Sequence, residues 1–249
     1  MKKIIWTGLL ILTACTTATP ELTPIPLATA TRVTPTLIPA TDTPTAIPSP
    51  TSTSTPLLPK QYFTEEFDSP LTYWSVLYAS GEASSVDVRS ENSSLSFELS
   101  ASNTWIYVIY GGFEYDGVHL ETRVENHGSD VNTMGLVCNY NESEGWYEFN
   151  ISSDGEYSVL YGQWLADGIA HYIPIVDDTS EYIQTGNAIN EISLDCYEGI
   201  LELHINDKPF RKLDVSRFEL SKGKVGFTLS SFSEVPVILS FDWVEVSEP

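Results

Sequence analysis

The chain has 249 residues, with 12 Lys and Arg against 34 Asp and Glu and a formal net charge of −22 at pH 7. So acidic a chain is a poor partner for nucleic acid or for anionic lipid headgroups, because clustered cations bind both. We interpret the charge as a source of solubility outside the cell, and the binding of a cation or a basic partner is the alternative.

Residues 1–15 have the order of a secretory signal. Lys2 and Lys3 precede an apolar run over 4–12, which is shorter than the roughly 20 residues of a membrane-spanning helix. The run ends in Leu12-Thr13-Ala14-Cys15, which resembles the lipobox of bacterial lipoproteins. The resemblance implies that Cys15 is lipidated and anchors an exported protein to the bacterial membrane, with its domain outside the cytoplasm. An ordinary secretion signal with a chance cysteine is the alternative.

Residues 16–60 have the composition of a linker. This segment holds 14 Thr and 10 of the 15 Pro of the chain, and it contains no Gly and no aromatic residue. Proline lacks the amide hydrogen that helices and sheets use, and so little apolar surface cannot offset the cost of ordering. The composition therefore predicts a disordered stalk between the membrane anchor and a folded domain.

Residues 61–249 form one predicted domain of the all-β class. Runs rich in Val, Ile, Tyr, Phe and Thr alternate with turn residues, including Asp154-Gly155, Glu198-Gly199 and Asn206-Asp207. The predicted strands are 63–67, 74–78, 85–88, 95–99, 105–110, 118–125, 135–140, 146–151, 157–161, 169–174, 192–197, 201–205, 225–229 and 238–246. Their number and spacing predict a jelly-roll β-sandwich of two antiparallel sheets.

Alternation within the predicted strands assigns side chains to faces. In 146–151, Tyr147, Phe149 and Ile151 share one face, which we expect to be core. The run WIYVIY at 105–110 is apolar at every position, so we expect this strand to be central and covered on both sides.

Cys138 and Cys196 are the two cysteines of the predicted domain, and each alternates with apolar neighbours. In an exported protein such thiols oxidise, so we predict that the two form a disulfide. A reactive or metal-binding role is the alternative, although neither residue has a CxxC partner.

Several segments resemble the concanavalin A-like lectin and glucanase sandwich, and in particular its laminin-G-like and 3-keto-disaccharide-hydrolase-like branches. These segments are EEFDSPLTYW (65–74), GLVCNYNESEGWYEFNISSDGEYSVLY (135–161), ISLDCYEGILELHIND (192–207), GKVGFTLSSF (223–232) and SFDWVEV (240–246). The resemblance implies the fold, and some members of the family are hydrolases that act on sugars.

Glucanases of this sandwich carry a strand of the form Glu-x-Asp-x-(x)-Glu, because glycosidases need carboxyl groups roughly 5 to 9.5 Å apart. Acidic residues two apart include Glu66/Asp68, Glu142/Glu144 and Asp154/Glu156, and none of these pairs continues to a third acid on a central strand. We therefore expect no glycosidase site and name no catalytic residue.

Carbohydrate binding is the function that the residue types favour most. Sugar sites combine aromatic faces with amide and carboxylate groups, and Trp146, Glu148 and Asn150 form such a set on one strand face. The set extends to four further aromatic residues, Trp105, Tyr107, Tyr161 and Trp164. The alternative is that these aromatic side chains serve burial rather than binding.

A structural Ca²⁺ is a further expectation. The closing strand resembles the last strand of family-16-like glucanases, whose aspartate holds Ca²⁺ opposite the N-terminal strand. By that resemblance Asp242 would be a ligand, with Glu66 or Asp68 near it.

Taken together, these features predict a surface lipoprotein whose sandwich binds a glycan without catalysis. A sugar-active hydrolase and a structural or protein-interaction module of the cell envelope are the two alternatives.

Overall fold

The computed structural model describes residues 58–91, 93–165 and 169–249. Its strands are β1 (Phe63–Glu65), β2 (Trp74–Ser80), β3 (Val86–Glu91), β4 (Ser94–Leu99), β5 (Trp105–Tyr115), β6 (Gly117–Asn126), β7 (Asn132–Asn141), β8 (Gly145–Ile151), β9 (Glu156–Trp164), β10 (Ala170–Thr179), β11 (Ile189–Tyr197), β12 (Ile200–Ile205), β13 (Lys208–Asp214), β14 (Gly223–Ser231) and β15 (Val237–Ser247). The predicted signal segment with Cys15, and the predicted stalk up to residue 57, lie outside the described residues.

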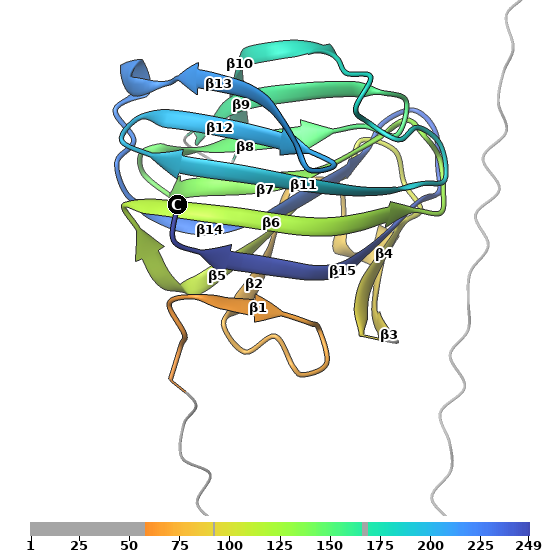
Figure 1. Ribbon diagram of the computed structural model, residues 1–249. Helices are drawn as coiled ribbons and strands as arrows, with labels where there is room; N and C mark the ends of the chain where they lie inside the picture. Colours follow the sequence, from red (N-terminus) through yellow and green to blue (C-terminus); the bar gives the residue numbers. More distant parts are fainter. Residues whose placement is uncertain (1–57, 92, 166–168) are drawn as a thin grey trace, which may run out of the picture. The chain divides into compact units, whose positions relative to one another are not determined.

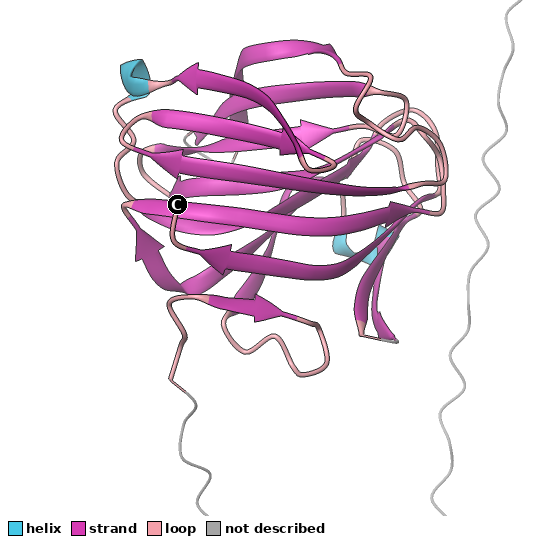
Figure 2. Ribbon diagram, in the orientation of Figure 1, coloured by secondary structure: helices cyan, strands magenta, loops and turns pink. Residues whose placement is uncertain are grey.

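The strands form two antiparallel sheets that pack face to face (Figures 1 and 2). Sheet A has the order β13-β12-β11-β6-β15-β4-β3, with β1 paired to β15, and sheet B has the order β10-β9-β8-β7-β14-β5-β2. The prediction of an all-β, two-sheet sandwich is confirmed. Within the described ranges, no helix is both long and apolar enough to cross a membrane.

The core between the sheets is built by the period-two pattern. On β8 the side chains of Tyr147, Phe149 and Ile151 are at most 2 % exposed, and they pack in one cluster with residues of β6, β11, β14 and β15. The prediction that these three residues face the core is confirmed.

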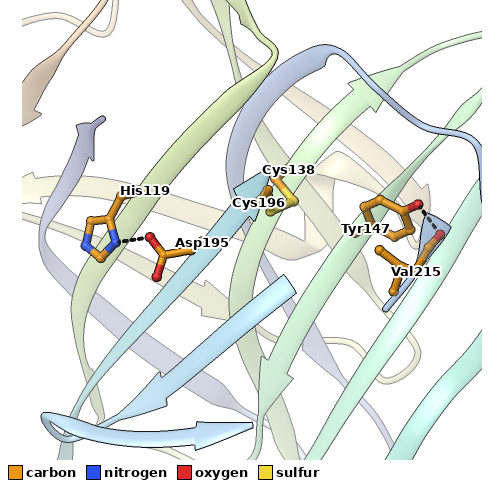
Figure 3. Close-up of a disulfide and its surroundings, with 6 residues drawn as sticks. All are labelled: His119, Cys138, Tyr147, Asp195, Cys196 and Val215. Carbon is orange, nitrogen blue, oxygen red and sulfur yellow. Dashed lines mark hydrogen bonds and ion pairs between the residues drawn. A yellow bond between two sulfur atoms is a disulfide. The ribbon is translucent and has the colours of Figure 1, made fainter. Parts of the chain in front are cut away.

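The disulfide ties the two sheets together (Figure 3). Cys138 lies on β7 of sheet B and Cys196 on β11 of sheet A, with their Cα atoms 6.6 Å apart and both side chains buried. The two cysteines are 58 residues apart in the sequence. In the chain-entropy model, a disulfide that closes a loop of this length stabilises the fold by about 4 kcal/mol. The predicted pairing is confirmed.

Strand β5 is buried on both faces, as its unbroken apolar run predicts. Ile106 and Val108 face the core between the sheets, whereas Tyr107 and Ile109 belong to a second buried cluster on the outer face of sheet B. The strand is not central, however, because only the edge strand β2 separates it from the margin of sheet B. The outer face of β5 is therefore covered by side chains of the second cluster and not by another sheet.

Strand β13, which forms a hairpin with β12, was not predicted from the sequence. Its segment KPFRKLD has few apolar residues, because β13 is an edge strand whose residues are all partly or fully exposed. The predicted turn before it is present. Asn206 and Asp207 have φ values of +51° and +61°, the left-handed pair that a tight two-residue hairpin needs.

Candidate functional site

The outer face of β8 carries the predicted sugar-binding row of Trp146, Glu148 and Asn150. The structure brings the three side chains together but buries them, with exposures of 0 %, 0 % and 1 %. Two glycines on the neighbouring strands make room for the row. A Cβ on Gly162 would lie 2.4 Å from the Trp146 ring, and a Cβ on Gly135 would lie 2.3 Å from the Asn150 amide oxygen.

Glu148 is the centre of a buried polar network. Trp146 Nε1 donates to its Oε1 at 2.7 Å, Asn150 Nδ2 donates to its Oε2 at 3.1 Å, and the Tyr107 hydroxyl donates to its Oε1. Tyr107 also shares a hydrogen bond of 2.8 Å with the Tyr172 hydroxyl. Complete burial raises the pKa of Glu148 and outweighs the three donors, which act in the opposite direction. The pKa of Tyr107 is raised as well, first by burial and then by the nearby Glu148 charge, so its hydroxyl keeps the proton that it donates.

Aromatic side chains from distant strands cover this network. The rings of Trp105 on β5 and Tyr172 on β10 stack with centroids 4.9 Å apart and an interplanar angle of 15°. Four strands separate β5 from β10, so a flat sheet would hold the two strands about 24 Å apart, beyond the reach of both side chains. Sheet B is therefore curved, and its concave outer face is closed by its own side chains.

Trp164 extends this aromatic cover. Its ring lies 5.1 Å from the ring of Trp146, and its Nε1 donates to the Tyr140 hydroxyl at 2.9 Å. Trp105 Nε1 likewise donates to Thr228 Oγ1 at 3.0 Å. Since the indole N–H groups of Trp105, Trp146 and Trp164 all have partners inside the protein, this side of the sheet matches the burial alternative rather than an open aromatic strip.

Tyr161 does not belong to the same face. It pairs with Tyr147 across β8 and β9 and lies in the core between the sheets, where its ring stacks on Phe218 at 4.5 Å. Its hydroxyl donates to the backbone oxygen of Glu144 at 2.7 Å. Including Tyr161 in the row was wrong. Tyr161 and Trp164 are an odd number of positions apart on β9, so their side chains point to opposite faces of the sheet.

A pocket of about 330 Å³ lies at the Asn150 end of the row. Its apolar wall includes Leu160 and Phe232, and Thr133 and Ser158 contribute hydroxyl groups. The Oδ1 atom of Asn150 is buried and has no hydrogen-bond partner among the described residues. A buried acceptor without a donor costs about 1–3 kcal/mol, so Asn150 Oδ1 is an acceptor beside the pocket that the described residues leave unused.

The rim of this pocket is acidic. Asp154, Glu156 and Asp177 line it and are exposed. In the sequence Asp154 and Glu156 form only a pair around a predicted turn, with no visible relation to Asn150. The connection arises because the turn between β8 and β9 folds back beside the last outward residue of β8.

The Ca²⁺ site expected at Asp242 with Glu66 or Asp68 stays a prediction. In the described part of the chain, the group of three or more potential ligands is formed by Glu121, Glu191 and Asp207, which does not include Asp242, Glu66 or Asp68. Asp68 instead accepts a hydrogen bond of 2.6 Å from Ser93 Oγ. The protein thus has an acidic triad that could hold a cation, at a place other than the predicted one.

Comparison with known proteins identifies the fold. No protein-family model matches the chain, and no curated protein matches it in sequence. Among solved structures it is similar to a family 16 glycoside hydrolase from the mixed-linkage glucan locus of Bacteroides ovatus, with a TM-score of 0.55 at 11 % identity over 74 % of this chain and 99 % of that one. It is also similar to the β-glucanase of Bacillus licheniformis, with a TM-score of 0.53 at 12 % identity over 76 % of this chain and 99 % of that one.

The laminarinase catalytic domain of Thermotoga maritima is a third similar structure, with a TM-score of 0.52 at 12 % identity over 76 % of this chain and 99 % of that one. The fold is therefore the concanavalin A-like jelly roll, as the sequence resemblance implied. At such low identity the similarity establishes the fold alone.

Proposed function

We propose that this protein is an exported lipoprotein, anchored to the bacterial membrane through Cys15, whose sandwich binds a carbohydrate without catalysis. The ligand lies in the pocket beside Asn150. The observation that carries this proposal is the buried, unpartnered Asn150 oxygen at the edge of a pocket that also has an apolar wall and hydroxyl groups.

The chemistry of the pocket suits a sugar. A sugar hydroxyl is the donor that Asn150 Oδ1 lacks, and Phe232 and Leu160 offer apolar surface to the C–H groups of a pyranose ring. The acidic rim of Asp154, Glu156 and Asp177 repels anionic ligands. We therefore expect neutral or amino sugars to bind and glycans with carboxylate or sulfate groups to be excluded.

Two features support binding without hydrolysis. The sequence lacks the Glu-x-Asp-x-Glu strand of the glucanases. The buried carboxylate on the concave face, Glu148, accepts hydrogen bonds from Tyr107, Trp146 and Asn150 and is covered by aromatic rings, so no substrate reaches it.

The test is a glycan array with the full chain, including mixed-linkage glucan, the sugar named for the Bacteroides ovatus structure. Affinity for each hit is then measured by calorimetry for the Phe232→Ala and Thr133→Val variants, and we expect each to lose about tenfold, or about 1.4 kcal/mol. Tyr62→Ala is the matched control, because Tyr62 is an exposed aromatic residue that does not line the pocket. Full affinity in both pocket variants, or no bound glycan, refutes the proposal.

A hydrolase is the second candidate, and the carboxylates around the pocket favour it. Asp154, Glu156 and Asp177 line the same pocket, so a bound sugar would lie near several acids. Release of new reducing ends from a bound glycan, abolished by Asp154→Asn or Glu156→Gln, would establish this function in place of simple binding.

A further inference from the structure

The acidic triad lies on the outer face of sheet A and is separate from the proposed sugar pocket. Glu121 lies on β6, Glu191 on β11 and Asp207 in the turn after β12, and each offers an oxygen within 4.8 Å of the other two. Glu121 is more than 60 positions from both Glu191 and Asp207 in the sequence. The pairing of β6 with β11 brings it next to them.

The backbone around the triad is held in place by hydrogen bonds. The Glu191 N–H donates to Asn206 Oδ1 at 2.9 Å, and the Asn206 N–H donates to the Glu191 backbone oxygen at 2.8 Å. Asn206 Nδ2 donates to the backbone oxygen of Tyr182 at 2.7 Å. These contacts fix the left-handed turn and hold Asp207 next to β11, so the triad is built into the fold.

The triad lines a pocket of about 230 Å³ together with Ser193, His119 and His204. Ser193 is 5 % exposed, and its hydroxyl group forms no hydrogen bond with any described residue. It lies directly opposite Glu121 on one side and His204 on the other. The Ser193 oxygen is not among the fully buried atoms, so it is open to the pocket, and a nearly buried side chain without a protein partner beside carboxylates is a second and independent sign of a missing ligand.

The charges around the pocket are not balanced within the protein. Arg123 Nε contacts Glu191 Oε1 at 2.9 Å, which leaves the second oxygen of Glu191 free of that ion pair. Glu245 lies opposite Glu121 on β15 and adds a further negative charge. Burial raises the pKa of Glu121; His119 lowers it, and the charges of Glu191, Glu245 and Asp207 raise it again.

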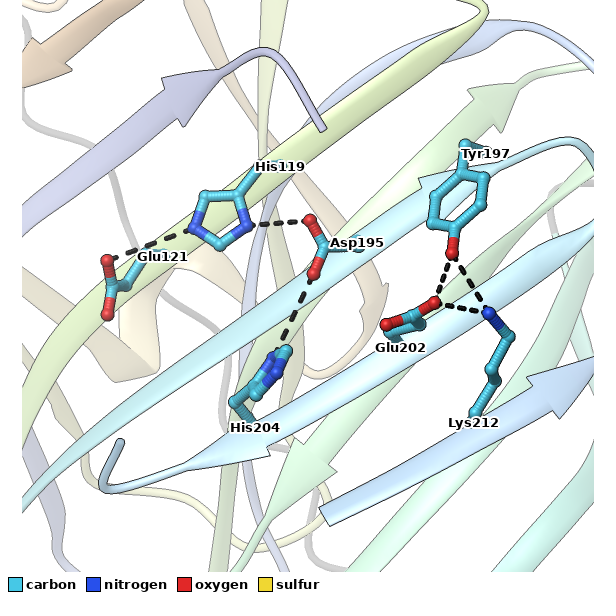
Figure 4. A network of polar contacts seen from close by, with 7 residues as sticks. All are labelled: His119, Glu121, Asp195, Tyr197, Glu202, His204 and Lys212. Atoms are coloured by element: carbon cyan, nitrogen blue, oxygen red, sulfur yellow. Dashed lines mark hydrogen bonds and ion pairs between the residues drawn. The ribbon is translucent and has the colours of Figure 1, made fainter. Parts of the chain in front are cut away.

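His119 and His204 line the pocket, but neither belongs to the group of potential metal ligands. His119 Nδ1 lies 2.7 Å from Asp195 Oδ1, and His119 Nε2 lies 3.9 Å from Glu121 Oε2. His204 Nδ1 lies 3.8 Å from the other oxygen of Asp195, too far for a hydrogen bond. Figure 4 shows Asp195 between the two imidazoles, with His119 next to Glu121. The atoms that converge in the pocket are therefore carboxylate oxygens.

We propose that Glu121, Glu191 and Asp207, with the Ser193 hydroxyl, bind a calcium ion on the outer face of sheet A. Carboxylate and hydroxyl oxygens are hard ligands that suit Ca²⁺, and water completes its six to eight ligands. The carboxylates come from two strands and a turn. Ca²⁺ accepts flexible coordination by oxygen ligands, whereas Mg²⁺ demands a near-ideal octahedron.

The test is a titration of the full chain with Ca²⁺, followed by calorimetry and by thermal unfolding. We expect one saturable site with a Kd on the order of 10⁻⁴–10⁻³ M, as in extracellular calcium modules. Saturating Ca²⁺ should raise the Tm by about 3 °C or more, because the ion binds the folded state only. Glu191→Gln and Asp207→Asn should each weaken binding by about tenfold or more, and Ser193→Ala by a smaller factor.

Asp68→Asn and Asp242→Asn are the matched controls, because they remove the same charge at the place predicted from the sequence. Unchanged affinity in these variants supports the triad. Equal affinity in all variants, or loss only in Asp242→Asn, overturns the proposal. So does the lack of saturable Ca²⁺ binding, or a preference for Zn²⁺ that requires His119. Glycan binding takes place on the other sheet and should not respond to any of these changes.

Discussion

The buried carboxylate of Glu148 makes a quantitative prediction possible. Replacing Glu148 with Leu leaves three donors, from Tyr107, Trp146 and Asn150, without their acceptor in the interior. Each buried donor without a partner costs about 1–3 kcal/mol, so we expect Glu148→Leu to lower the free energy of unfolding by about 3 kcal/mol or more.

Glu148→Gln is the matched variant. Its side-chain oxygen can still accept from Tyr107 and Trp146, while its new NH₂ group faces Asn150. A rotation of the Asn150 amide then presents the unpartnered Oδ1 to that NH₂ group and restores the contact. We therefore expect Glu148→Gln to cost about 1 kcal/mol or less at neutral pH, well below the loss in Glu148→Leu.

Comparing the wild type with Glu148→Gln separates the effect of the Glu148 charge on stability from the effect of its hydrogen bonds. The folded pKa of Glu148 is raised above its unfolded value, so between the two values the folded state holds a proton that the unfolded state has lost. The wild-type free energy of unfolding should then fall as pH rises from about 4.5, by up to about 1.4 kcal/mol per pH unit. This contribution is present below the unfolded pKa and lost as pH passes through the folded pKa, and Glu148→Gln lacks it.

Urea unfolding of wild type and Glu148→Gln across pH 4.5 to 8 is the assay. The pKa of Glu121 is also raised, but it contributes equally to both proteins and cancels in their difference. Parallel stability profiles for the two proteins would refute the reasoning, as would a Glu148→Leu variant as stable as Glu148→Gln.

Two further predictions concern the sandwich itself. Replacing Cys138 and Cys196 together with Ala should lower the free energy of unfolding by about 2–5 kcal/mol, measured in urea, and a reducing agent should have the same effect on the wild type only. If the double variant unfolds at the wild-type midpoint, the bridge does not stabilise the sandwich. Gly162→Ala should cost about 1–3 kcal/mol, because its Cβ would meet the Trp146 ring at 2.4 Å, whereas Gly111→Ala, with its nearest neighbour at 3.5 Å, should cost less than 1 kcal/mol. Equal stability of these two glycine variants would show that Trp146 can move away from β9.

The interior was predictable because alternation along a strand depends only on local geometry. Tyr147, Phe149 and Ile151 had to share a face, and Cys138 likewise shares one with Leu136. The strand β13 was missed for the opposite reason. Its side chains are partly or fully exposed, so no hydrophobic period marks them, and only pairing with β12 makes the segment a strand.

The candidate site was only partly predictable from local patterns. The sequence placed Trp146, Glu148 and Asn150 on one side of β8, and the structure agrees. It carried no sign that Tyr172 of β10 would stack on Trp105 of β5 and close that side, because this contact depends on the curvature of a whole sheet. Curvature is a collective property of many paired strands, and no single strand records it.

The sequence by itself determined the class of fold, the disulfide and the side of β8 that faces the core, because each follows from residue type and a period of two. Tertiary structure decided which outward residues are accessible. It buried Trp146 and Glu148, left an unpartnered oxygen of Asn150 beside a pocket, and brought Glu121, Glu191 and Asp207 within 4.8 Å of one another. Such meetings depend on pairing between strands far apart in the chain, and that pairing is settled only when the whole sandwich closes.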